Sequence, residues 1–122
     1  MIRLTLATLL LTTLGAACGS SSNPPAQQDS PATSASVTSV SCTGITPAMT
    51  ISTNGDAYSP TSASISVGQV IQFTMPTAHN VSSTTTGLAV DFGQTACLKF
   101  TAAGTYNFKC SVHLFTGSVT VM

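Results

Sequence analysis

The sequence predicts an all-β domain in residues 37–122, folded as a Greek-key β-sandwich of about eight short strands. Two observations predict this fold class. No stretch of useful length repeats its apolar residues at helical spacing. The apolar residues come instead in short runs that are bounded by Gly, Pro, Ser and Asn.

The runs place the strands in chain order. We expect strands at 37–41, 49–53, 63–67, 70–75, 79–83, 97–101, 105–110 and 118–122. Turn-forming residues separate several of them, as at Asn54-Gly55-Asp56. Alternation in the late strands puts Leu98 and Phe100 on one face, and puts Tyr106, Phe108 and Cys110 on one face. Cys110 is therefore expected to point inward, where its plain alternative role is that of a small core residue.

Residues 1–17 are expected to be a signal peptide of the lipoprotein type. Arg3 gives a positive start, the run from Leu4 to Leu14 is apolar, and small residues precede Cys18. The apolar run is too short for an ordinary membrane span. Processing would leave Cys18 as an acylated first residue, although glycine stands where such sites usually have leucine. The alternative is an ordinary signal peptide cut near Ala17.

Residues 18–36 are rich in Ser and Pro and contain almost nothing that could be buried. Such a segment is expected to be a disordered tether. Together with acylation of Cys18 it predicts an exported protein that is anchored in a membrane and faces the periplasm or the cell exterior.

Charged side chains are scarce: the chain has three Lys and Arg residues and three acidic residues. Without Arg3, three carboxylates remain against two lysines, which gives a net charge of −1 with neutral histidines. With no polybasic patch, we expect no nucleic-acid partner. Electrostatic steering of a partner should be weak, and we expect a monomer.

The end of the chain carries the chemistry. Cys110 and His113 are three residues apart where a strand runs into a turn, and His79 is the only other histidine. One thiolate and two imidazoles are the equatorial ligands of a blue-copper centre.

The order of motifs resembles the plastocyanin/azurin type of small cupredoxin, over roughly residues 37–122. The motifs are Val67-Gly68-Gln69, His79-Asn80-Val81, Ala103-Gly104-Thr105-Tyr106, Cys110-x-x-His113 and Gly117-x-Val119-x-Val121. The resemblance implies a cupredoxin-like sandwich with one type 1 copper ion held by His79, Cys110 and His113. It also implies exchange of electrons with redox protein partners.

The resemblance assigns roles to neighbouring residues. His113 with Leu114 and Phe115 would form the electron port; the alternative is that Leu114 and Phe115 seal the core from water. Asn80 would brace the two ligand loops through hydrogen bonds. The axial methionine usual in this family is missing after His113. Thr116 is nearest to its place, and the carbonyl of Ala78 is the other candidate.

Two cysteines remain once Cys18 is assigned to lipid and Cys110 to copper. In an exported protein two such cysteines, here Cys42 and Cys97, usually pair. The alternative is two separate thiols.

We therefore expect a one-electron Cu(I)/Cu(II) carrier between extracytoplasmic redox partners. A copper-delivery protein would want a Met- and His-rich exchangeable site, and this chain has only two histidines. A degenerate domain with an altered copper site is the other alternative, supported by the missing methionine. We do not expect an enzyme, because oxygen or nitrite chemistry needs further copper ligands.

Overall fold

The structure, a computed structural model, describes residues 36–122. The expected signal peptide (1–17), the expected lipidation site Cys18 and the expected tether up to residue 35 lie outside these residues. Within the described part, no helix is long and apolar enough to cross a membrane.

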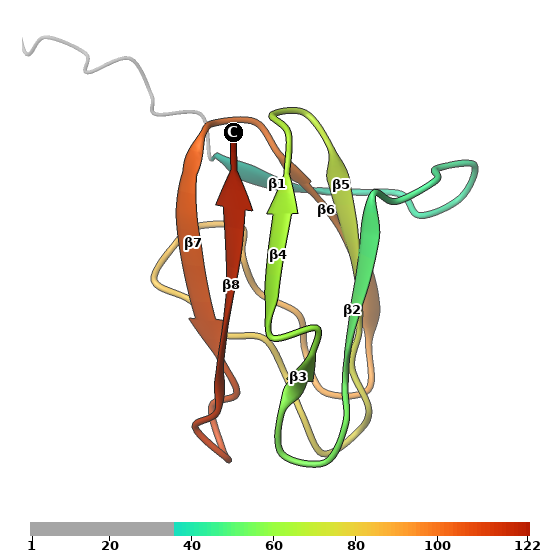
Figure 1. Cartoon of the computed structure of the whole chain (residues 1–122). Helices are drawn as coiled ribbons and strands as arrows, with labels where there is room; N and C mark the ends of the chain where they lie inside the picture. Colours follow the sequence, from blue (N-terminus) through green and yellow to red (C-terminus); the bar gives the residue numbers. More distant parts are fainter. Residues whose placement is uncertain (1–35) are drawn as a thin grey trace, which may run out of the picture. The chain divides into compact units, whose positions relative to one another are not determined.

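Eight strands form two sheets, which confirms the expected all-β sandwich (Figure 1). One sheet has the order β1-β6-β5-β2-β3 and the other the order β4-β8-β7. The bounds are β1 Val37–Val40, β2 Met49–Thr53, β3 Tyr58–Ser59, β4 Ser62–Ile65, β5 Val70–Thr74, β6 Thr95–Phe100, β7 Gly104–Lys109 and β8 Thr116–Val121. Two pairings are parallel, β2 with β5 and β4 with β8, so the chain crosses between the sheets instead of only folding back in hairpins.

The core lies between the two sheets and follows the expected alternation. Leu98 and Phe100 of β6 are buried, as are Tyr106 and Phe108 of β7. The rings of Phe73 in β5 and Phe108 meet edge to face with centroids 5.6 Å apart, which joins one sheet to the other. Cys110 follows in the same phase as Phe108 and is fully buried.

The strand expected at 79–83 is wrong. This stretch makes only isolated bridges, Val81 with Val90 and Ser82 with Lys109. The chain leaves β5 before Pro76, which has no amide proton for a ladder. The segment then runs as a connection, and this frees His79 to turn toward the other sheet.

The short strand β3 was not expected. Tyr58 and Ser59 are too few to give a periodic pattern, and Pro60 ends the run. Tyr58 nevertheless is almost completely buried, and its strand pairs with the end of β2. Strands β6 and β8 also each begin two residues earlier than expected, at Thr95 and Thr116.

The expected disulfide between Cys42 and Cys97 is present, with the two Cα atoms 5.3 Å apart. It ties the segment after β1 to the middle of β6, and it closes a loop with a sequence separation of 55 residues. By the loop-entropy relation a bridge of this span stabilises the fold by about 4 kcal/mol.

Removing the bridge should lower stability without touching the cluster around Cys110. We expect the copper-free Cys42→Ser/Cys97→Ser variant to unfold at a melting temperature lower by roughly 10 °C or more, because 1 kcal/mol corresponds to about 4–8 °C in a domain of this size. Differential scanning calorimetry measures the change. A variant that melts with the copper-free wild type would contradict a stabilising bridge.

Candidate metal centre

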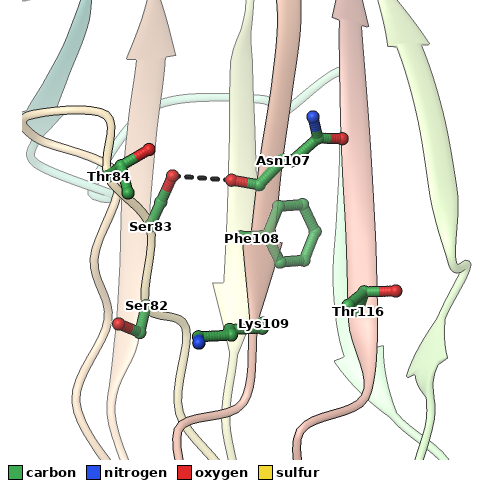
Figure 2. A pocket seen from close by; sticks show the side chains of 7 residues that line it. All are labelled: Ser82, Ser83, Thr84, Asn107, Phe108, Lys109 and Thr116. Carbon is green, nitrogen blue, oxygen red and sulfur yellow. Dashed lines mark hydrogen bonds between the residues drawn. The ribbon is translucent and has the colours of Figure 1, made fainter.

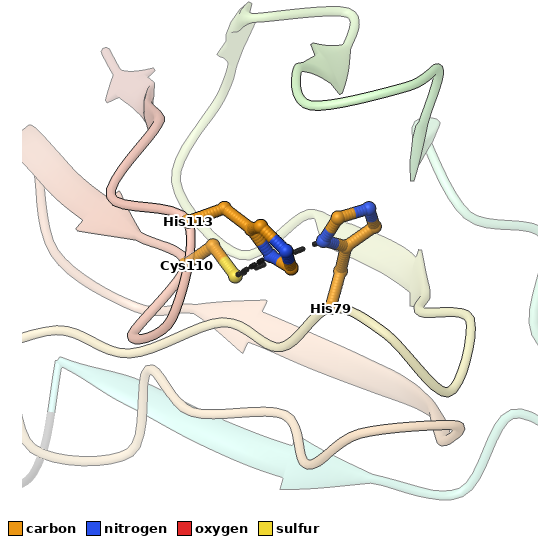
Figure 3. Close-up of side chains that lie close together, drawn as sticks. All are labelled: His79, Cys110 and His113. Atoms are coloured by element: carbon orange, nitrogen blue, oxygen red, sulfur yellow. Dashed lines mark hydrogen bonds between the residues drawn. The ribbon is translucent and has the colours of Figure 1, made fainter.

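The side chains of His79, Cys110 and His113 converge at one end of the sandwich (Figure 3). The Cys110 Sγ atom lies 3.8 Å from Nδ1 of His79 and 3.7 Å from Nδ1 of His113. All three ligand atoms lie within 4.8 Å of one another. His79 and Cys110 are buried, whereas His113 is exposed.

A tight turn brings His113 back over Cys110. The amide of Leu114 donates to the carbonyl of Cys110 at 3.0 Å, and the amide of Cys110 donates to the carbonyl of Phe115 at 3.0 Å. Leu114 has a φ of 62°, a left-handed conformation that leucine rarely adopts. The chain thus reverses its direction within six residues, Cys110 to Phe115, before β8 begins.

His79 is positioned by the connection that follows β5. Its amide donates to the carbonyl of Pro76 at 3.1 Å, and the same carbonyl accepts from Gly93 at 3.0 Å. Two residues later Val81 pairs with Val90 in both directions, at 2.8 and 3.0 Å. These bonds fix the backbone on either side of the imidazole.

Asn80 links the two ligand segments. Its Oδ1 atom accepts from the amide of Ser111 at 2.8 Å and from the Ser111 hydroxyl at 3.1 Å. Its backbone carbonyl accepts from the Tyr58 hydroxyl at 2.6 Å. These are the contacts that a bracing asparagine would make.

The surroundings of Cys110 favour its thiolate. Burial by itself raises the pKa of the thiol, but hydrogen bonds from the backbone of His113, Asn80 and Val112 and from the His113 imidazole lower it from 9.0 to about 6. The thiolate is the form that binds metal. Burial, together with the charge of the nearby Cys110 thiolate, raises the pKa of the Tyr58 hydroxyl, which stays a hydrogen-bond donor.

Comparisons with known proteins bear on the fold. No protein-family model matches the chain, and no curated protein matches it in sequence. Solved structures do match: a reduced variant of amicyanin superposes with a TM-score of 0.59 at 23% identity, covering 71% of this chain and 99% of that one. An oxidized amicyanin variant has the same identity and coverage with a TM-score of 0.58. A Cu(I) form of another variant, at 22% identity, also gives 0.58 over 71% and 99% of the two chains.

The chain has the cupredoxin fold. This confirms the fold that the motif order implied. At this level of identity the likeness establishes the architecture alone, so the chemistry of the centre has to be argued from its own three side chains.

Those side chains fit one type 1 copper ion. Bond lengths of about 2.3 Å to sulfur and 2.0 Å to nitrogen, typical of a divalent ion, place the two donors about 3.7 Å apart when the angle between the bonds is 120°. The two sulfur–nitrogen distances, 3.8 and 3.7 Å, agree with that trigonal value. A trigonal set of two imidazoles and one thiolate is the blue-copper arrangement.

Leu114 and Phe115 have different environments, and the roles considered for this pair stay a prediction. Phe115 is half-buried, with its ring centroid 4.6 Å from that of Tyr58 and 5.0 Å from that of His79. It lies against the His79 ring on the buried side of the three-residue cluster. Leu114 is 64% exposed and faces solvent beside His113.

The axial position is not assigned by these contacts. Thr116 is exposed and lies opposite Lys109 in the β7–β8 register; Figure 2 shows both side chains. The neighbouring Gly117 is buried and faces the core. Alternation therefore turns Thr116 toward the outer face of the sheet, which weighs against an axial role. Axial ligation by Thr116 or by the Ala78 carbonyl stays a prediction.

Sequence reasoning missed two side chains at this centre, Asp56 and Tyr58. Asp56 Oδ1 lies 3.9 Å from Nε2 of His79, and Tyr58 holds Asn80 and packs on Phe115. The Asn54-Gly55-Asp56 turn was recognised, but a turn motif does not say which distant side chain it faces.

The lowered thiol pKa predicts how stability of the copper-free protein depends on pH. The folded thiol titrates near 6 and the unfolded one near 9.0, so the unfolded chain binds more protons in that window. Stability should rise with pH from about 6 to 9, by at most roughly 1.4 kcal/mol per unit of pKa shift. Urea unfolding at a series of pH values measures this. Cys110→Ser is the control, and an equal rise in that variant would contradict the effect.

Proposed function

We propose that this protein is a type 1 copper protein that carries single electrons between redox protein partners. The observation that carries the proposal is the convergence of the Cys110 sulfur with two imidazole Nδ1 atoms at trigonal distances. Copper bound there would supply a one-electron couple, Cu(I)/Cu(II).

The residues of the chain supply a fixed ligand geometry. Hydrogen bonds within the Cys110 turn, the Asn80–Ser111 link and the bonds around His79 hold the three donors without help from the ion. Ligands held in this way have little room to rearrange when the charge at the centre changes. Small rearrangement is what a fast electron carrier needs.

The exposure of the ligands indicates the route for the electron. His79 and Cys110 are buried, so His113 is the ligand that reaches solvent. Two exposed apolar side chains flank it, Val112 at 62% and Leu114 at 64%. We infer that this small apolar surface with the His113 edge at its centre is where a partner docks.

The same geometry weighs against the alternatives. A copper-delivery site should be open for exchange, whereas two of these three donors are buried. A degenerate domain should have lost ligand geometry, whereas both Nδ1 atoms lie at a distance from the Cys110 sulfur that lets one ion contact both atoms of each pair. We propose no substrate and no enzymatic reaction.

We propose an exported protein held at a membrane by a lipid on Cys18. The Cys42–Cys97 disulfide supports an oxidising compartment outside the cytoplasm. The proposal for Cys18 rests on the sequence of residues 1–18. We also propose that the protein acts as a monomer.

Membrane fractionation tests the anchor. The wild-type protein expressed with its own leader should sediment with membranes, and Cys18→Ser should release it or block its processing. Finding unmodified wild-type protein in the soluble extracytoplasmic fraction would contradict lipid anchoring.

A visible spectrum tests copper binding. The Cu(II)-loaded protein should be intensely blue or green from charge transfer between the Cys110 thiolate and copper, and Cys110→Ser should lose the colour while keeping the β-sheet signal in circular dichroism. Thr116→Val, on the outer face, should keep both the colour and the EPR spectrum. A colourless wild type that takes up no Cu(II) would refute the proposed function, and a changed Thr116→Val spectrum would make Thr116 the axial ligand.

Electron self-exchange tests the docking surface. Leu114→Asn removes the exposed apolar side chain and keeps a residue that tolerates positive φ. We expect an unchanged potential and a self-exchange rate several-fold slower by NMR line broadening, because less apolar area is buried between two molecules. Val67→Asn is the control, since Val67 is also exposed, at 49%, but follows β4 at the opposite end of the sandwich. Equal slowing in both variants would contradict docking through Leu114.

A further inference from the structure

A carboxylate lies beside the buried histidine of the centre. Asp56 Oδ1 is 3.9 Å from Nε2 of His79, the ring nitrogen on the other side from the Nδ1 that faces Cys110. In Figure 3 one nitrogen of the His79 ring points toward the sulfur and the other points away from it. Nδ1 of the His79 ring thus faces a thiolate, and Nε2 faces a carboxylate.

The turn between β2 and β3 puts Asp56 there. The amide of Asn54 donates to the carbonyl of Ala57 at 2.9 Å, and Gly55 has a φ of 57°, a conformation that suits glycine. The next strand residue in the core, Tyr58, bonds to the carbonyl of Asn80, directly after His79. The hydrogen bond of Tyr58 therefore fixes the turn to the segment that carries His79, and the carboxylate of Asp56 in this turn faces the His79 imidazole.

A carboxylate in this place has two physical effects. When Nδ1 of an imidazole is the donor to a metal, its proton sits on Nε2, and a nearby acceptor stabilises that tautomer. A negative charge also favours the more positive of two oxidation states, because its attraction grows with the charge at the centre. At 3.9 Å the contact is longer than a short hydrogen bond, so the carboxylate acts mainly through its negative charge.

Screening limits the size of the effect. The Asp56 side chain is 74% exposed, whereas that of His79 is 9% exposed. Exposed charges interact weakly and are sensitive to salt. Few other charges act on the centre, however, because Asp56, Asp91, Lys99 and Lys109 are the only Asp, Glu, Lys or Arg residues in 36–122.

We propose that Asp56 is a positioning residue for His79, which holds the Nε2–H tautomer and makes the centre favour Cu(II), lowering its reduction potential. The second part of this proposal rests on the proposed function. The first part concerns the protein without copper and can be tested without it.

The copper-loaded protein tests the effect on the potential. Asp56→Asn should weaken Cu(II) binding about three- to tenfold in a competition assay, less than the 10–100-fold of well-buried outer partners, and should weaken Cu(I) binding less. The potential measured by voltammetry should rise accordingly, and the difference from wild type should shrink as salt is added.

Asp91→Asn is the matched control, because it removes the same charge from a carboxylate with no ion-pair contact to a histidine among the described residues. Asp56→Glu should restore most of the wild-type potential. If Asp56→Asn and Asp91→Asn shift the potential equally, the effect belongs to net charge and the proposal is overturned. An unchanged potential in Asp56→Asn overturns it as well.

The copper-free protein separates this proposal from the function. In alkaline buffer, nitrogen chemical shifts of His79 should show a smaller Nε2–H fraction in Asp56→Asn than in wild type or Asp91→Asn. Equal fractions in all three would refute the positioning role, whatever copper does. A wild type that binds no copper would refute the proposed function and leave this tautomer comparison to decide the role of Asp56.

Discussion

The centre depends on one short antiparallel contact between the connection after β5 and the end of β7. This contact is an isolated bridge and not part of a sheet. Ser82 and Lys109 exchange both backbone hydrogen bonds at 2.9 Å, and two residues further along each segment Asn80 bonds through its side chain to Ser111. These contacts continue one register, so His79 and Cys110 meet although they are 31 residues apart in the chain. Without these hydrogen bonds, nothing in the connection after β5 would align the His79 imidazole with Cys110 at the end of β7. The fold brings two loops together, and these few bonds set their alignment.

Burying a thiolate is unfavourable unless donors surround it, and this environment supplies them from its own backbone. The same turn that returns the chain to β8 points the amides of Val112 and His113 at the sulfur and lowers its pKa to about 6. The turn therefore serves geometry and electrostatics together. Its left-handed Leu114 stores about 1–3 kcal/mol of backbone strain. Residues of this kind persist only where the surrounding bonds over-determine them, as the two bonds of Cys110 do here.

Local patterns were enough to predict the sandwich, the inward phase of Cys110 and the Cys42–Cys97 bridge. Those features follow from alternation and from cysteine counting, which are properties of the chain itself. The prediction of a strand at 79–83 was wrong, because Val81 and Ser82 make only isolated bridges there and join no sheet. Tyr58 and Asp56 were missed for a different reason. Their roles exist only after β2 and β5 pair in parallel and carry the Asn54–Ala57 turn to the same end as His79, a tertiary relation that no local spacing encodes.

The scarcity of charge in this domain gives single charges unusual weight. On a densely charged surface the field of one exposed carboxylate is averaged out by its neighbours, but here two acidic and two basic side chains share the surface of residues 36–122. Lys109 is the residue before the ligand Cys110 but points to the outer face with Thr116, away from the sulfur. The nearest charge aimed at the ligand set is therefore negative. If partners dock by apolar contact at Val112 and Leu114, as we propose, Asp56 would adjust the potential of bound copper without changing that surface.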